Sequence, residues 1–304
     1  MTKYINQILA ILVLLLMNSH INAQQTPVFS DYYYNQSILN PAHSGYYLDT
    51  EISISNFGFL NDFEGNPRTF SGIFNANFNE NTVGVSGGIS NDQIGVSSVT
   101  SIFGSYAYKI NFGHYYNRAR WWDYNPDVLS FGVTAGLLLF NENLSSLNIQ
   151  GDPNFEEDVN ITIPTFGLGV LYNHNRLHLG FSVQNLFSNS IANDQNINIQ
   201  VPLYIYGGYK FYFTKFEEIR IQPSALIKFE NQAPAQIDLN ISANYKNKIE
   251  VGTGYRTTSS FNGLVGIYFA KKLRFAYSYT AYNRNTPFAN TNGFILTYRS
   301  GEGF

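Results

Sequence analysis

Two histidines, His174 and His178 in the stretch HNRLH, have a spacing that can hold a metal ion when the chain is helical. Positions i and i+4 meet on one helix face, and two imidazoles placed in this way are common zinc ligands. An extended chain advances about 3.3 Å per residue, which separates the same positions by about 13 Å. The surrounding residues alternate as a strand does, so we expect turn and strand-end residues and no metal site.

Four carboxylates gather in the stretch GDPNFEED, residues 151–158. The D-x-D-x-D-G spacing of a calcium loop is absent, so we expect a solvated loop, with bound calcium as the alternative. Elsewhere, no nucleophile between glycines is accompanied by a base and an orienting group. We therefore predict no cofactor, no metal and no enzymatic activity.

The segment with Arg118, Arg120, Trp121 and Trp122 combines two chemistries. Tryptophan prefers the interface between membrane and water, and arginine pairs with phosphate or carboxylate groups. The segment could therefore form part of an aromatic girdle with lipid headgroup contacts. The alternative is a docking surface for a periplasmic partner.

The composition excludes several classes of protein. Charged residues make up 13% of the chain and aromatic residues 16%, against about 25% charged in an ordinary soluble domain. The net charge of −3, without a basic cluster longer than a pair such as Lys271 and Lys272, gives no support for nucleic-acid binding. Because the chain has no cysteine, disulfides do not hold it together.

Residues 1–23 have the order of a secretory signal peptide. Lys3 precedes an apolar run from Ile8 to Met17, and the predicted cleavage follows Ala23. The apolar run is too short for the ~20 residues of a membrane-spanning helix. The alternative is an uncleaved anchor.

Residues 50–304 show a repeat of two, with apolar and polar side chains alternating as in QIDLNISANY at 236–245. Most of these runs are long enough to cross a bilayer as tilted strands. We predict an all-β fold, a transmembrane antiparallel β-barrel of about fourteen strands in contact with outer-membrane lipid. A soluble β-sandwich, the alternative, would have shorter strands and more surface charge. The predicted strands are 50–57, 66–77, 81–90, 94–110, 128–140, 163–173, 176–184, 203–213, 218–229, 236–245, 248–257, 261–270, 272–282 and 291–300.

The segment between the signal and the barrel, residues 24–49, is aromatic but follows neither a helical nor a strand period. A barrel of fourteen strands is wide enough to leave a lumen. With the N-terminus in the periplasm, Phe29 and Tyr32 could lie against the inner wall, with Asn40 and Pro41 turning the chain toward the first strand. This plug has an alternative, in which the segment lies across the periplasmic mouth or binds a partner there.

The same segment carries a recognisable signature, Gln25-x-Pro27-x-Phe29-Ser30-x-Tyr32-x-x-Asn35 followed by Asn40-Pro41-Ala42-x-x-Gly45. It resembles the N-terminal signature of the PorP/SprF family of outer-membrane proteins. Further matches occur at 63–69, 91–95, 106–108, 129–136, 152–155, 223–224, 238–240, 255–256 and 276–279. The sequence departs from the family pattern at 57–60, at Thr280 and at Asn292-Gly293, which puts any family contact at those positions in doubt.

The resemblance implies a non-enzymatic component of the type IX secretion system, the outer-membrane export route that also serves gliding motility. Its partners would be other proteins of that system and the C-terminal region of a large secreted surface protein. The alternatives are an outer-membrane pore and a core component needed for every secreted protein. Candidate plug or partner contacts are Pro27, Phe29, Tyr32, Asn35, Asn40, Pro41, Arg118, Arg120, Trp121 and Trp122.

Overall fold

The computed structural model describes residues 33–58, 65–79, 81–113, 122–147, 149, 157–188, 199–231, 233–257, 260–282 and 290–304. The signal peptide, its cleavage after Ala23 and most of the acidic stretch 151–158 lie outside these residues. So do six of the candidate contacts, namely Pro27, Phe29, Tyr32, Arg118, Arg120 and Trp121. Within the described ranges, no helix is long and apolar enough to cross a membrane.

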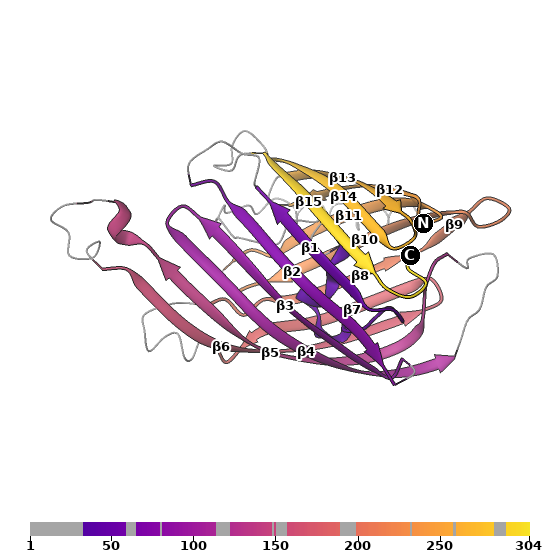
Figure 1. Ribbon diagram of the computed structural model, residues 1–304, viewed down its shortest axis with the longest axis horizontal. Helices are drawn as coiled ribbons and strands as arrows, with labels where there is room; N and C mark the ends of the chain where they lie inside the picture. Colours follow the sequence, from indigo (N-terminus) through magenta and orange to yellow (C-terminus); the bar gives the residue numbers. More distant parts are fainter. Residues whose placement is uncertain are drawn as a thin grey trace, which may run out of the picture.

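Fifteen strand segments form one antiparallel sheet that closes on itself where β1 pairs with β15 (Figure 1). Both β8 and β9 pair with the same edge of β10, so the two segments count as one member of the ring. The ring therefore has fourteen members, which confirms the predicted barrel. The segments are β1 (Glu51–Phe57), β2 (Arg68–Phe78), β3 (Val83–Ile94), β4 (Ser97–Gly113), β5 (Asp127–Glu142), β6 (Val159–His174), β7 (Leu177–Leu186), β8 (Leu203–Tyr209), β9 (Phe211–Phe213), β10 (Ile219–Phe229), β11 (Gln236–Tyr245), β12 (Ile249–Arg256), β13 (Ser260–Phe269), β14 (Leu273–Tyr282) and β15 (Thr291–Arg299).

The alternation of the sequence becomes the two faces of the wall. In β1, Ile52 and Ile54 are about half exposed on the outside, while Ser53 and Ser55 are buried on the inside. Apolar side chains that face outward can meet lipid, and closure of the ladder leaves no unpaired edge in hydrocarbon. The outer face near one end carries rings at Phe78, Phe112, Tyr172, Tyr209, Phe211, Phe213, Tyr245, Phe269 and Tyr298.

The strand expected at 203–213 is divided at Lys210. The pairing of β8 with β10 stops at Gly208 and Ser224, and β9 resumes it at Phe211 and Ile221. On the other side the pairing with β7 continues, since the amide of Lys210 donates to the carbonyl of Arg176 at 2.8 Å, one position beyond the pair of Leu177 and Tyr209. Pro223, which has no N–H to donate, lies opposite the break.

The two ends of the barrel differ in their connections. Glu51 of β1 and Arg299 of β15 lie at one end, together with the short turns 79–82, 175–176, 246–248 and 270–272. We call this the short-turn end; its exception is the longer connection 114–126 between β4 and β5. The connections 143–158, 187–202 and 283–290 lie at the opposite, long-loop end, where β5 and β6 extend beyond the other strands (Figure 1).

Residues 33–47, here called the luminal segment, pass inside the ring of strands (Figure 1). A short helix, α3 (Gln36–Leu39), is followed by a 3₁₀ turn, η1 (Pro41–His43). Asn40 caps the turn by accepting a hydrogen bond from the amide of Ala42, and Pro41 supplies a fixed φ at its first position. The turn packs against β4, β5 and β6.

Candidate functional site

Asn40 is the central anchor of the luminal segment and is fully buried. Its amide nitrogen lies 3.0 Å from the carbonyl oxygen of Val170, 3.2 Å from that of Phe181 and 2.9 Å from the Tyr206 hydroxyl. The wall makes room at Gly169, where a Cβ would lie 1.9 Å from Oδ1 of Asn40. The asparagine therefore bonds directly to the main chain of the barrel wall.

Small polar side chains of the wall satisfy the carbonyls of the luminal segment. Ser182 and Gln184 donate to the carbonyl of Leu39 at 2.6 and 2.8 Å, and Ser130 donates to that of Ala42 at 2.7 Å. A short non-repetitive segment cannot satisfy its own main chain, and buried carbonyls without partners are costly. The inward serines thus fix the conformation of the segment as well as its position.

Further along, the chain turns at Gly45, whose carbonyl accepts from Asn77 at 2.9 Å and from the Lys109 ammonium group. Ser44 and Ser86 share a hydrogen bond of 2.8 Å. Asn35, another predicted contact, is buried just before α3, and its carbonyl accepts from the amide of Ile38. Strands β2 to β7 all contribute contacts to the luminal segment.

At its start, the luminal segment meets a carboxylate on β12. The hydroxyl of Tyr33 donates to Glu250, and that of Tyr268 donates to the other carboxylate oxygen at 2.8 Å. Arg220 lies 3.7 Å from Glu250. Burial, reinforced by the charge of Glu250, raises the pKa of Tyr33 well above its ordinary value, so the phenol stays protonated and able to donate.

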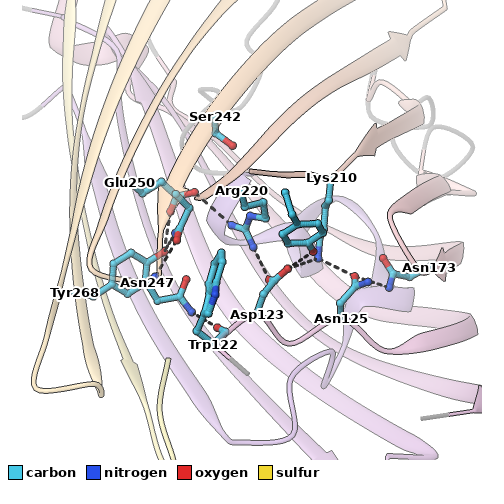
Figure 2. A network of polar contacts seen from close by, with 12 residues as sticks. Trp122, Asp123, Asn125, Asn173, Lys210, Arg220, Ser242, Asn247, Glu250 and Tyr268 are labelled. Atoms are coloured by element: carbon cyan, nitrogen blue, oxygen red, sulfur yellow. Dashed lines mark hydrogen bonds and ion pairs between the residues drawn. The ribbon is translucent and has the colours of Figure 1, made fainter. Parts of the chain in front are cut away.

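The end of the β4–β5 connection, residues 122–126, also turns into the lumen, and ion pairs hold it there (Figure 2). Asp123 lies 2.6 Å from Arg220 and 3.6 Å from Lys210, and it accepts a hydrogen bond from Tyr212. Burial alone would raise the pKa of Asp123. The two cations and the phenol outweigh burial and hold this pKa below its ordinary value.

Trp122 is 4% exposed and lies beside this network (Figure 2). Its carbonyl accepts from Asn247 at 2.6 Å, and its ring lies 5.9 Å from the Arg220 guanidinium. Asn125 accepts from Lys210 at 2.7 Å and from Asn173 at 3.1 Å. A lipid-facing girdle, one of the two interpretations of this segment, therefore does not describe Trp122.

The luminal segment and residues 122–126 border a cavity of about 1020 Å³ at the short-turn end. Its lining combines rings, amides and charged groups, as at Tyr46, Asn111 and Arg274. Such a volume can accept a ligand far larger than an ion.

Histidines contribute no metal centre among the described residues, where no group of three or more His, Asp or Glu side chains converges. His174 is largely exposed beside Asp127, whereas His178 is buried in the lumen. His43 of the luminal segment stacks on Tyr206, with the ring centroids 5.8 Å apart. Burial, with the nearby His178 and Lys109, lowers the pKa of His43 to about 3, so its imidazole is neutral.

Residues 21–299 match the sequence profile of the family described as type IX secretion system membrane protein PorP/SprF. The chain belongs to the PorP/SprF family. This membership and the barrel fold assign the protein to the outer membrane as a component of the type IX secretion system. Membership also implies contact with other proteins of that system.

Solved structures similar to this PorP/SprF protein are outer-membrane barrels. The outer membrane protein Omp33 of Acinetobacter baumannii has 10% identity and a TM-score of 0.48, covering 84% of this chain and all of its own. A mutant of the Rh. blastica porin has 7% identity and a TM-score of 0.37, covering 84% of this chain and 99% of its own. At these values the likeness carries no argument about function. No curated protein matches the chain.

Of the residues singled out in the sequence, Asn35, Asn40, Pro41 and Trp122 lie within the described part of this PorP/SprF barrel, and all four are inside it. Whether they close the lumen or contact a partner stays a prediction. The sequence did not single out the charged wall residues that hold them. One signal was available, because the inward positions of the strands are otherwise small or polar and a charged residue among them stands out. Such residues are Lys109, Lys210, Arg220, Glu250 and Arg274.

Proposed function

We propose that this protein is a non-enzymatic partner barrel, which binds the C-terminal region of a large secreted surface protein, such as a gliding adhesin, during export or surface attachment. Family membership supports the assignment to the secretion system. The finer role is supported by the way the lumen is filled.

The anchoring of the luminal segment is the observation that carries this proposal. A passive pore needs a continuous aqueous path, whereas here residues 33–47 cross the lumen and hydrogen-bond to strands on several sides, as at Asn40 and Gly45. The tip at Asp123 adds a second obstruction. A barrel built in this way is better suited to holding a partner than to free diffusion.

The lengths of the connections support an orientation for the barrel. Outer-membrane barrels have short turns in the periplasm and longer loops outside. On this rule the short-turn end and the N-terminus face the periplasm, and the cavity opens toward proteins that arrive there. The outward apolar belt contacts outer-membrane lipid.

Deletion of the gene provides the test. We expect one or a few large proteins to disappear from the cell surface while general secretion continues, as measured by proteomics of shaved cells and culture medium. Complementation with the intact gene is the control. Intact display of every surface protein would contradict the proposal, and loss of the whole secretome would indicate a core component instead.

The pore alternative is separated by conductance. We expect the purified protein in planar bilayers to show little steady current, and a variant lacking residues 26–45 to show a larger one. A large steady current through the intact protein would favour the pore. An unchanged current in the deletion variant would mean that the segment serves partner binding without closing the lumen.

A further inference from the structure

One wall of the cavity carries alternating rings and guanidinium groups. Arg274 lies over the Tyr34 ring at 4.1 Å and over the Phe304 ring at 4.9 Å. Arg299 also lies over the Phe304 ring, at 4.0 Å, and over the Tyr47 ring, at 3.6 Å. We call these five residues the arginine stack; it joins the luminal segment to β14 and β15.

The two arginines of the stack differ in their counter-charges. Arg299 forms an ion pair with Glu51, with contacts of 2.6 and 3.0 Å. Arg274 is 5% exposed, and its Nη2 donates to the Thr297 hydroxyl at 3.0 Å. Its Nε makes no hydrogen bond, and within the described part of the chain no carboxylate comes within ion-pair distance of it. Glu51, the partner of Arg299, also acts electrostatically on Arg274, so two buried guanidinium groups share one carboxylate. A second anion beside Arg274 would balance the remaining positive charge.

The stacking restricts which anion can bind. The rings of Tyr34 and Phe304 pack against the Arg274 guanidinium, which favours contact of a ligand with the N–H groups at its edge. Donors in one plane match the two oxygens of a carboxylate. The cavity of about 1020 Å³ is much larger than a carboxylate, and it is lined by tyrosine and asparagine side chains that can contact a main chain.

We propose that the cavity binds a carboxylate group carried by an extended peptide, with the edge of Arg274 as its principal contact. The inference rests on the proposed function for the origin of the peptide, the secreted partner. The binding site itself is defined by the arginine stack. The ligand enters from the short-turn end, where the cavity lies.

The test measures binding of synthetic probes to the purified, folded barrel by isothermal titration calorimetry. The probes are an acetylated eight-residue peptide of Gly, Ser and Val with a free C-terminal carboxylate, the same peptide amidated, an amidated version with a central Asp, and sodium acetate. We expect both carboxylate peptides to bind and the amidated peptide without Asp to bind at least tenfold more weakly.

Substitutions locate the site. We expect Arg274→Gln to weaken binding of the free-acid peptide by about tenfold or more. Arg274→Lys keeps the charge without the planar edge and should give an intermediate loss. The control is Lys248→Gln, which removes one cation from an exposed position at the same end, outside the cavity lining, and should leave binding unchanged. Each variant is first checked for the heat-dependent gel mobility of a folded barrel.

Equal binding of the free-acid and amidated peptides would overturn the proposal, and this comparison needs only the unmodified protein. Equal binding by Arg274→Gln and the unmodified protein would also overturn it. If acetate bound as tightly as the carboxylate peptides, the site would be one for small anions, and the peptide part of the proposal would be wrong. Failure of all probes alongside loss of surface proteins in the deletion strain would reject this site and retain the proposed function.

Discussion

Two parts of the chain fill the lumen, and the wall holds them in different ways. The luminal segment is fixed mainly by neutral hydrogen bonds from small side chains, such as Ser130 and Ser182, and by close packing on glycines. The tip at residues 122–126 is fixed by the charges of Lys210 and Arg220 around Asp123. Both kinds of contact are buried, since the side chains of Lys210, Arg220 and Asp123 are 8%, 13% and 4% exposed, and salt screens such pairs much less than it screens surface pairs. The comparison indicates one filler that depends on neutral hydrogen bonds and packing and a second one that depends on buried charges.

The largest expected effect comes from Gly132→Ala, which attacks the packing of the luminal segment. The added Cβ would lie 2.2 Å from the amide nitrogen of Ala42, a main-chain atom that cannot rotate away. We expect the segment to lose about 3 kcal/mol of local stability, measured by hydrogen exchange of residues 36–47.

The matched control for that prediction is Gly104→Ala, on the neighbouring strand, where an added Cβ would meet nothing within 4 Å. Its exchange should equal that of the unmodified protein. Unchanged exchange in Gly132→Ala itself would show that packing on the wall does not hold the segment.

Asn40→Ala tests the hydrogen bonds without adding volume. It removes the donor to Val170, Phe181 and Tyr206 and the cap of the 3₁₀ turn. We expect a loss of about 2 to 3 kcal/mol, visible as faster exchange of residues 40–45. Faster exchange only at residues 122–126 would contradict the conclusion that different contacts hold the luminal segment and the tip.

Asp123→Asn tests the charged filler. Lys210 and Arg220 would lose their carboxylate, and we expect the tip to open with a cost of about 2 kcal/mol. Exchange of the luminal segment should stay unchanged in this variant, because its contacts are neutral hydrogen bonds and packing. Unchanged exchange of residues 122–126 in Asp123→Asn would remove the proposed difference.

The pH dependence of the tip follows from the same carboxylate. The pKa of Asp123 is lower in the folded protein, so its contribution is complete above the ordinary aspartate range. It disappears only as the pH falls through the lowered value. Exchange of residues 122–126 should therefore be unchanged between pH 7.5 and 5.5.

The luminal segment should respond to the same pH change through His43, whose folded pKa is about 3. Its contribution is complete above the unfolded value of about 6.5 and is lost as the pH falls from there toward 3. Acidification from pH 7.5 to 5.5 should cost the luminal segment about 1 kcal/mol, measured by exchange of residues 41–45. His43→Gln should remove this dependence, and its persistence in that variant would assign it to another group.

Local sequence was sufficient for the wall. Alternation as regular as that of residues 236–245 admits little except a strand with two different faces, and the predicted run coincides with β11. Even so, the run at 203–213 itself gave no sign of its break, because the break lies opposite Pro223 on another strand, β10.

The sequence by itself determined the barrel, its approximate strand count and the family, because these depend on short-range periodicity and on a contiguous signature. Only the tertiary structure decided which charges meet inside it. Asp123 and Arg220 lie 97 positions apart, and Tyr34 reaches Arg274 across nearly the whole chain. Such contacts depend on closure of the ring, since joining β1 to β15 brings the first and last inward side chains to one lumen, and no local pattern records that juxtaposition.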